Sequence, residues 1–286
     1  MPAIREHMVP TSYGTFHVEE TGNGAPVLFL HGGTASAREW RTVLPVLGAH
    51  ARCIAFDRLG CGASDRSAAG YDRDTVTRSL LACADALGLE TFGVVGQSMG
   101  GFWALSLVAA APDRISHLVL VNSVGAPTTE QERDAMRARM ARSQDAERTQ
   151  PPADPVLAQE QELDRLVAFC FADPRRAPQS YRSDAVWHTE RADPAQMAAV
   201  RSELQRMGQG SYEHITCPTL VIWGESDAAM PPERGKRLAE AIPGARFVGL
   251  PGCGHLCQVE CPDAFINALA PFLDDMASGP RHPRGS

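Results

Sequence analysis

Short apolar runs alternate with longer helix-like segments along most of this 286-residue chain. The runs are continuous and rich in β-branched residues, a pattern typical of strands that are buried on both faces of a parallel sheet. Thr15–Glu20 instead alternates between apolar and polar residues, which predicts an N-terminal edge strand. The continuous runs are Val27–Leu30, Cys53–Phe56, Phe92–Val95, His117–Val121, Leu220–Trp223 and Arg246–Leu250.

The segments between these runs predict helices. Asp74 is a candidate cap for the first of them, and Pro271 is expected to bend or break the last. Alternating strands and helices indicate the α/β class, with a mostly parallel, twisted sheet flanked by helices and an active site at the carboxyl ends of its strands. The predicted helices are Asp74–Leu87, Met99–Ala111, Pro232–Ala241 and Pro262–Met276.

One long stretch interrupts the alternation. Residues 124–210 contain repeated prolines, many charged residues and no convincing strand, so we interpret them as short helices inserted between two strands. Such an insertion would lie above the carboxyl edge of the sheet as a helical lid. The predicted organisation is therefore a core of residues 1–123 and 211–276, a lid of residues 124–210, and a disordered tail of residues 277–286.

The strongest chemical signal is the G-x-S-x-G pattern at Gly96–Gly100, between the strand Phe92–Val95 and a predicted helix. A sharp strand-to-helix turn brings the two elements close together, so the positions two before and two after the serine must be small. Such a turn holds its central residue, Ser98, in a strained conformation at the top of the sheet, beside a helix N-terminus that favours negative charge.

With this motif, the chain resembles the α/β-hydrolase family from about Tyr13 to Met276. The resemblance rests on several further motifs in the family's order. They are the HG motif at His31–Gly33, a D-x-x-G-x-G-x-S segment at Asp57–Ser64, the strand end at Ile222–Asp227 and a G-x-G-H turn at Gly252–His255. We interpret Asp57–Ser64 as structural support.

The family places nucleophile, acid and base in that order along the chain, which gives Ser98, Asp227 and His255 here. A serine hydroxyl needs a neighbouring base, which His255 supplies, and Asp227 would orient the imidazole and stabilise its charged form. Some relatives carry the acid after the preceding strand. That position reads Asn122 and Ser123 and offers no carboxylate, which favours Asp227.

The resemblance also implies an oxyanion hole and a pocket. The expected donors are the backbone N–H groups of Met99 and Gly33, with Thr34 as an alternative for the second. The insertion contains Trp187, His188 and Arg191. These residues could line a substrate pocket or could equally pack within the lid, and the sequence favours neither interpretation. The candidate pocket residues are His31, Gly32, Thr34, Trp187 and Leu256.

Eight cysteines in a chain of this length do not predict a disulfide framework. Cys253, Cys257 and Cys261 surround the candidate base, but their spacing lacks the C-x-x-C of common zinc sites, and a metal there would sequester His255. We therefore predict no metal. Cys257 is a candidate for reaction with thiol reagents.

Composition limits the remaining classes. Hydrophobic residues make up 44% of the chain, enough for a sizeable core, and the formal net charge of −7 argues against a nucleic-acid partner. No signal peptide and no apolar run long enough to span a membrane is evident, which favours the cytoplasm. The residues do not indicate an oligomeric state.

A serine nucleophile argues against relatives that use aspartate or cysteine. We expect a hydrolase of an ester, thioester or lactone of a small to medium apolar molecule, with no cofactor. A carbon–carbon hydrolase of the meta-cleavage-product type is the second hypothesis, although those enzymes carry an aromatic residue where this chain has Leu256. A non-hydrolytic cyclase or acyltransferase, and a ligand receptor on the same fold, stay open.

Overall fold

A computed structural model describes residues 2–33, 35–132, 134, 138, 155–206 and 211–277 of the chain. Its centre is an eight-stranded sheet in the order β1-β2-β4-β3-β5-β6-β7-β8. The first two pairings, β1 with β2 and β2 with β4, are antiparallel, and all the others are parallel. The strands are β1 Arg5–Thr11, β2 Gly14–Thr21, β3 Pro26–Leu30, β4 Arg52–Phe56, β5 Phe92–Gln97, β6 Ile115–Val121, β7 Thr219–Gly224 and β8 Arg246–Leu250.

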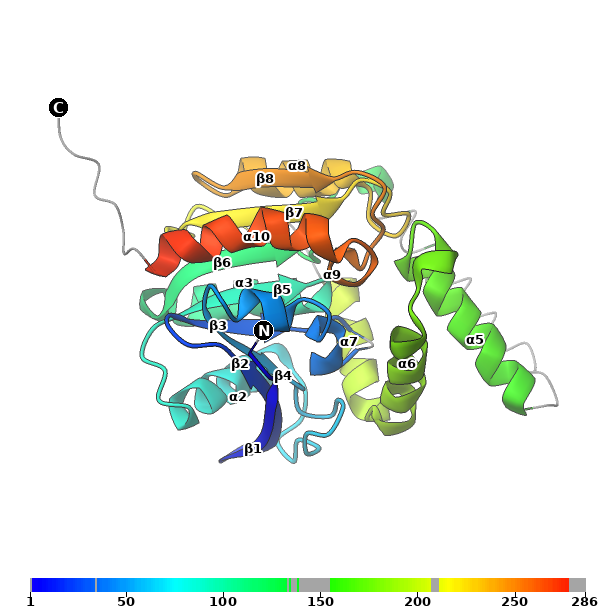
Figure 1. Ribbon diagram of the computed structural model, residues 1–286, viewed down its shortest axis with the longest axis horizontal. Coiled ribbons are helices and arrows are strands. Elements are labelled where there is room, and N and C mark those ends of the chain that lie inside the picture. The colour runs from blue at the N-terminus through cyan, green and yellow to red at the C-terminus, as the bar shows by residue number, and fades with distance from the viewer. Residues whose placement is uncertain are drawn as a thin grey trace.

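Helices cover both faces of this sheet (Figure 1), and the mostly parallel α/β architecture predicted from the sequence is confirmed. Between β6 and β7 lie α5, α6 and α7. The α-helices are α1 Leu44–Leu47, α2 Arg73–Ala86, α3 Met99–Ala110, α5 Pro155–Cys170, α6 Gln179–Arg191, α7 Pro194–Arg206, α8 Pro232–Ala241, α9 Cys257–Glu260 and α10 Pro262–Ala277. Shorter 3-10 turns are η1 Ala37–Trp40, η2 Pro112–Arg114 and η3 Pro174–Arg176.

The two-sided burial explains why the strand sequences are continuously apolar. In β3, Leu28 and Leu30 belong to the core on one face of the sheet, together with residues of α2, α3 and α8. Val27 and Phe29 belong to the core on the other face, together with residues of η1, α1 and α10. Because successive side chains of a strand point to opposite faces, a strand between two cores must be apolar at every position.

Three sequence predictions about elements are wrong in detail. The predicted edge strand is β2, and the edge is β1, which pairs with β2 along its whole length. Helix α2 begins at Arg73 rather than Asp74, because the side chain of Asp72 accepts the backbone N–H of Thr75 at 3.0 Å. Helix α10 continues through Pro271. Burial of Leu269, Phe272 and Leu273 against the sheet offsets the lost backbone hydrogen bond.

The helices between β6 and β7 lie at the end of the sheet toward which the parallel strands point (Figure 1). Within residues 155–206 this segment consists of helices joined by short loops, as the sequence predicts. Its predicted role as a lid and its predicted limits at 124 and 210 stay predictions, since residues 139–154 and 207–210 lie outside the described part. Ala277 is the last residue of α10, and the rest of the predicted tail, residues 278–286, also lies outside it.

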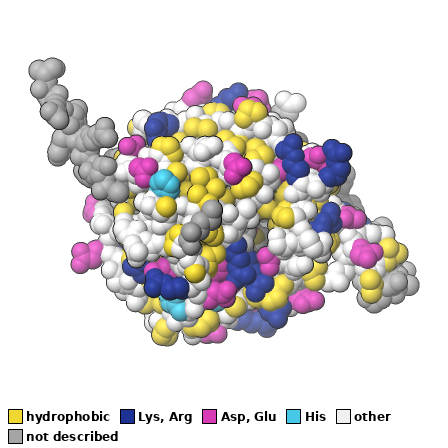
Figure 2. All heavy atoms as spheres, viewed as in Figure 1, with side chains coloured by type: hydrophobic (Ala, Val, Ile, Leu, Met, Phe, Trp, Pro, Cys, Tyr) yellow, Lys and Arg dark blue, Asp and Glu magenta, His cyan; other side chains and the backbone are white. Residues whose placement is uncertain are grey.

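The surface shows no separation of charge on the face seen in Figure 2, where acidic and basic side chains are interspersed. Within the described residues, no helix is both long enough and apolar enough to cross a membrane.

Candidate active site

The turn between β5 and α3 has the geometry that the G-x-S-x-G pattern predicts. Ser98 has φ 50° and ψ −115°, a region that residues other than glycine rarely occupy. A side chain at Gly96 would overlap the backbone of Gly100, and one at Gly100 would overlap the backbone of Leu30. The half-buried Ser98 therefore sits on a sharp turn that only small flanking residues permit.

The candidate acid and base lie on the loops after β7 and β8 and contact each other. Nδ1 of His255 donates to Oδ2 of Asp227 at 2.7 Å, and both side chains are buried. The other carboxylate oxygen of Asp227 accepts the backbone N–H groups of Ala229 and Met230 at 2.8 and 2.9 Å. The acid is therefore fixed by its own turn before it orients the imidazole.

Asn122, at the end of β6, is a further support for the acid. Its side-chain amide donates to Oδ2 of Asp227 at 2.7 Å, and its carbonyl oxygen accepts from the Gly224 backbone at 3.2 Å and from Cys257 Sγ at 3.0 Å. Burial alone would raise the pKa of Asp227. The hydrogen bonds from His255, Met230 and Asn122 outweigh it and hold that pKa below its usual value, so Asp227 is an anion at neutral pH.

The base loop lies beside the serine turn and beneath α5. The side chain of Gln97, next to Ser98, donates to the backbone carbonyl of His255 at 3.0 Å. The backbone N–H of His255 donates to Cys170 at 2.8 Å, and the Phe169 ring packs edge-on at 5.5 Å from the imidazole. Hydrogen bonds thus bring Asp227 and His255 together, and the residue next to Ser98 joins the same assembly.

The predicted oxyanion loop passes close to the start of α3. A Cβ placed on Gly33 would lie 3.4 Å from Cγ of Met99, so the two candidate N–H donors belong to adjacent segments. A Cβ on Gly32 would lie 2.5 Å from Oε1 of Gln97, so a side chain there would require the Gln97 amide to move. Backbone N–H groups that are fixed before reaction are suited to stabilising an oxyanion.

Two buried ionisable side chains hydrogen-bond to this loop, and the sequence analysis assigned neither to it. Arg58 donates to the backbone carbonyls of His31 and, at 2.8 Å, Gly32. Oε1 of Glu39 accepts the backbone N–H of Gly32 at 3.2 Å. Arg58 lies inside the D-x-x-G-x-G-x-S segment interpreted as structural, and its support of the loop refines that interpretation. Glu39 carries no motif that indicates its role.

His31 lies beneath the loop rather than on its surface. The side chain is fully buried, with Nδ1 at 2.8 Å from the Gly32 carbonyl and Nε2 accepting the Arg58 backbone N–H at 3.2 Å. Burial, together with the charges of Arg58 and His188, holds the pKa of His31 well below its usual value. His31 is therefore a neutral support of the loop, and both of its ring nitrogens are used.

Comparison with known proteins identifies the fold family. A family model described as the alpha/beta hydrolase fold matches residues 25–262. The chain belongs to the α/β-hydrolase family.

The relatives of this α/β-hydrolase differ in their activities. It is 29% identical over 283 residues to a 2-hydroxymuconate semialdehyde hydrolase of Pseudomonas sp. strain CF600, covering 95% of this chain and 94% of that protein. It is also 29% identical over 272 residues to haloalkane dehalogenase 2 of Mycobacterium bovis, covering 91% of each. An esterase from Exiguobacterium antarcticum has the same fold, with a TM-score of 0.78 at 22% identity over 94% of this chain and 99% of that one.

The remaining pocket candidates of the hydrolase lie near the insertion. Trp187 of α6 makes cation–π contacts with Arg38 and Arg191, whose guanidinium carbons lie 3.9 and 4.7 Å from its ring centre. Leu256 packs in an apolar cluster with Val167 and other residues of α5. Thr34 lies outside the described residues. Trp187 and Leu256 therefore both contribute to the contact region between the core and the insertion.

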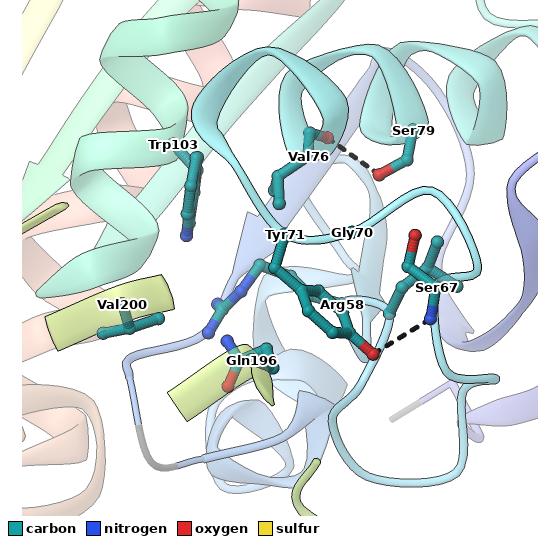
Figure 3. Close-up of a pocket in the computed structure, with 10 residues that line it drawn as sticks. Arg58, Ser67, Gly70, Tyr71, Val76, Ser79, Trp103, Gln196 and Val200 are labelled. Carbon is teal, nitrogen blue, oxygen red and sulfur yellow. Dashed lines mark hydrogen bonds between the residues drawn. The ribbon is translucent and has the colours of Figure 1, made fainter. Parts of the chain in front are cut away.

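Two pockets border this contact region. The smaller, about 10 Å³, lies between Arg58, Trp103 and residues Gln196 and Val200 of α7 (Figure 3). The larger, about 250 Å³, lies between η1 and α6 and is lined by Arg38, Glu39, Tyr181, Asp184 and His188, among others. Among the described residues, neither lining includes Ser98. Both pockets flank the segments that support the oxyanion loop.

The cysteines near the base correct two sequence interpretations. Cys253 and Cys261 are joined by a disulfide, which sequence reasoning missed although the pair brackets His255. Cys257 is fully buried, its Sγ contacts Asn122, and burial raises the pKa of its thiol far above the usual value. The expectation that Cys257 reacts with thiol reagents is therefore wrong, because the site lacks both access and a thiolate.

Proposed function

We propose that this α/β-hydrolase uses Ser98 as nucleophile and His255 as base to cleave an ester, thioester or lactone of a small to medium apolar substrate. The observation that carries the proposal is the 2.7 Å hydrogen bond between Asp227 and His255 beside the strained turn of Ser98. No other serine of the described chain has a positive φ.

The proposed first step is acylation. Because Nδ1 of His255 donates to Asp227, Nε2 is the nitrogen left to accept the proton of the Ser98 hydroxyl. The serine oxygen then attacks the acyl carbon, and the carbonyl oxygen becomes an oxyanion facing the N–H groups of Met99 and Gly33. The imidazolium that forms is stabilised by the Asp227 carboxylate and returns its proton to the leaving alcohol or thiol.

The proposed second step is deacylation. A water molecule takes the place of the leaving group, His255 accepts one of its protons, and the resulting hydroxide attacks the acyl carbon. Collapse of this second oxyanion releases the carboxylic acid and returns the proton to Ser98. The support of the oxyanion loop by Arg58 and Glu39 serves both steps, because each step forms a tetrahedral intermediate with its negative oxygen in the same place.

A carbon–carbon hydrolase is the second candidate function. The similarity to a 2-hydroxymuconate semialdehyde hydrolase over almost the whole chain favours it. Against it, Leu256 occupies the position of the expected aromatic residue and packs against α5. The dehalogenase relative does not suggest a third candidate, because the aspartate nucleophile expected of dehalogenases is replaced by Ser98.

The test is labelling with a fluorophosphonate, followed by mass mapping and by turnover of p-nitrophenyl butyrate. We expect one adduct on Ser98 and at least about a thousandfold loss of turnover in Ser98→Ala, because only binding and the oxyanion hole would remain. Ser12→Ala, on the exposed β1–β2 turn, is the matched serine control and should keep both properties.

Several results would change the assignment. Turnover above about a tenth of the wild-type rate in Ser98→Ala would exclude Ser98 as nucleophile. Labelling that persists in His255→Ala would exclude His255 as the activating base. Faster bleaching of a coloured vinylogous diketo acid than cleavage of the ester, with both reactions lost in Ser98→Ala, would select the carbon–carbon hydrolase instead.

A further inference from the structure

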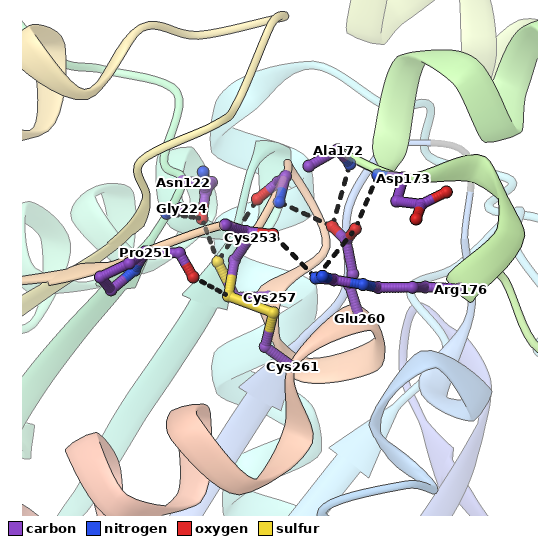
Figure 4. Close-up of a disulfide and its surroundings, with 12 residues drawn as sticks. Asn122, Ala172, Asp173, Arg176, Gly224, Pro251, Cys253, Cys257, Glu260 and Cys261 are labelled. Carbon is purple, nitrogen blue, oxygen red and sulfur yellow. Dashed lines mark hydrogen bonds and ion pairs between the residues drawn. A yellow bond between two sulfur atoms is a disulfide. The ribbon is translucent and has the colours of Figure 1, made fainter.

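The candidate base sits inside a short segment that is closed on itself by a covalent bond. The disulfide joins Cys253 and Cys261, which are eight positions apart, and His255 lies between them. The Cα atoms of the two cysteines are 6.1 Å apart, so the chain between them turns back on itself through α9 (Figure 4). We call residues 253–261 the base segment.

The base segment is also hydrogen-bonded to the insertion, through Glu260, which precedes Cys261 in the chain. The buried carboxylate of Glu260 accepts the backbone N–H of Gly254 at 2.7 Å, next to His255. It also accepts the N–H groups of Ala172 and Asp173, which follow α5, at 3.0 and 2.9 Å (Figure 4). A single side chain beside the disulfide thus connects the base turn to the insertion.

We propose that the Cys253–Cys261 pair is a redox site, whose disulfide holds His255 and the insertion in the working arrangement and whose reduction by a dithiol lowers turnover. The inference rests on the proposed function only in assigning catalysis to His255. Its structural half, that reduction loosens both the base segment and the residues that Glu260 holds, does not depend on the reaction.

The exchange reaction is balanced with a dithiol as the reductant. One thiolate of the reductant attacks Sγ of the half-buried Cys261, the protein S–S bond breaks, and Cys253 leaves as a thiolate that takes a proton from water. The second reductant thiolate then attacks the mixed disulfide and releases Cys261, which is protonated in turn. The disulfide gains two electrons, and the reductant becomes a cyclic disulfide.

The surroundings of the pair accommodate the reduced state. Sγ of Cys253 lies 3.6 Å from the carbonyl oxygen of Pro251, which can accept the new thiol hydrogen. Cys257, in the middle of the base segment, does not compete in the exchange, because burial raises the pKa of its thiol far above the usual value. Its Sγ lies 3.0 Å from Asn122, a contact that reduction of the other two leaves in place.

Loosening the base segment acts on chemistry more than on binding. His255 keeps its hydrogen bond to Asp227, but the two ends of the base segment become free to separate. The position of Nε2 relative to Ser98 is then less well defined. Since a displacement of about 1 Å at a catalytic group can cost up to about a hundredfold, we expect kcat for p-nitrophenyl butyrate to fall about tenfold to a hundredfold. KM should change by less than about threefold.

The experiment compares oxidised protein with protein reduced by dithiothreitol, and then reoxidised. Thiol titration under denaturing conditions should rise from the six free cysteines of the structure to all eight. Cys261→Ser should have the low kcat of the reduced form and should not respond to dithiothreitol. Cys217→Ser, at a half-buried thiol after the insertion, is the matched control and should respond as wild type does.

Hydrogen–deuterium exchange of the wild-type protein separates this inference from the proposed function. Faster exchange at Gly254, His255, Ala172 and Asp173 on reduction, with a reversible loss of kcat, supports the redox site. Equal kcat and equal exchange in both forms overturn it, as does a count of eight thiols after oxidation. Faster exchange in a protein without hydrolase activity in either form would support the structural half while overturning the proposed function and the predicted loss of turnover.

Discussion

Glu39 shows how a single buried group can support a catalytic loop without carrying charge. Its carboxyl is almost fully buried, and burial raises the pKa to about 8, against the opposing effects of the Gly32 N–H and the Arg58 charge. At neutral pH the group is therefore mostly protonated, while Oε1 accepts the Gly32 N–H. The oxyanion loop is thus held by one guanidinium and by two neutral side chains, Glu39 and His31.

This assignment predicts a pH-dependent stability. The pKa of Glu39 is raised from 4.5 to about 8 on folding, so the folded protein binds the extra proton between these values and loses stability as the pH rises through them. The limiting slope is about 1.4 kcal/mol per pH unit. Glu39→Gln keeps the acceptor and removes the titration. We expect its free energy of unfolding to match the wild type near pH 4 and to exceed it increasingly toward pH 8.

Chemical denaturation at several pH values measures this difference. Glu213→Gln, the same substitution at an exposed carboxyl between the insertion and β7, is the matched control. A Glu39→Gln difference that is constant from pH 4 to pH 8 would show that the Glu39 carboxyl ionises normally in the folded protein.

Sequence alone indicates those site residues that belong to short local patterns. Ser98 is predictable because its turn demands glycine on both sides, and Asp227 and His255 follow strands that end at the same edge of the sheet. Asn122 and Arg58 are not predictable in this way, because their partners lie far away in the chain, and Glu39 contacts the nearby Gly32 but belongs to no motif that indicates its role. Asn122 meets Asp227 across 105 positions, and Arg58 meets Gly32 across 26.

At the level of elements, apolar periodicity predicts the buried strands and the helices between them. Strand β8 has the predicted limits, and β5 extends the predicted run by two residues into the serine turn. Strand β1 was missed because its seven residues include charged side chains and a proline, and most of them are exposed at the edge of the sheet. Its pairing with β2 is a tertiary contact that no local pattern announces.

Close packing of α3 on the sheet gives a second prediction. A Cβ at Gly100 would overlap the carbonyl of Leu30, which belongs to the sheet and has no freedom to move away. We expect Gly100→Ala to lower the free energy of unfolding by at least about 3 kcal/mol and to abolish labelling of Ser98. Gly88→Ala is the matched control, with φ +70° and open space around it, and should cost about 1–2 kcal/mol while labelling persists.

At the scale of the whole molecule, polar contacts fasten the insertion to the core on more than one side. Glu260 holds the residues after α5, and Arg38 pairs with Asp184 of α6 at 2.9 Å. Before α7, Asp193 donates its backbone N–H to the Gly60 carbonyl and accepts the Tyr71 hydroxyl at 2.7 Å. The sequence predicts helices in this region, but contacts between residues 87 to 146 positions apart decide where they lie.

The Tyr71 contact allows the position of the insertion to be tested without touching the site. Tyr71→Phe removes the hydroxyl that donates to Asp193 and accepts the Ser67 N–H at 2.9 Å, which should cost about 1–2 kcal/mol locally. We expect hydrogen exchange to accelerate in α7 and to stay unchanged in β5 and β6, because the core does not depend on this contact. Tyr13→Phe, on the turn between β1 and β2, is the matched control and should leave α7 unchanged.

If Tyr71→Phe leaves exchange in α7 unaltered, the Glu260 and Arg38 contacts are sufficient to hold the insertion. Equal acceleration throughout the sheet would instead show that the insertion and the core unfold as one cooperative unit.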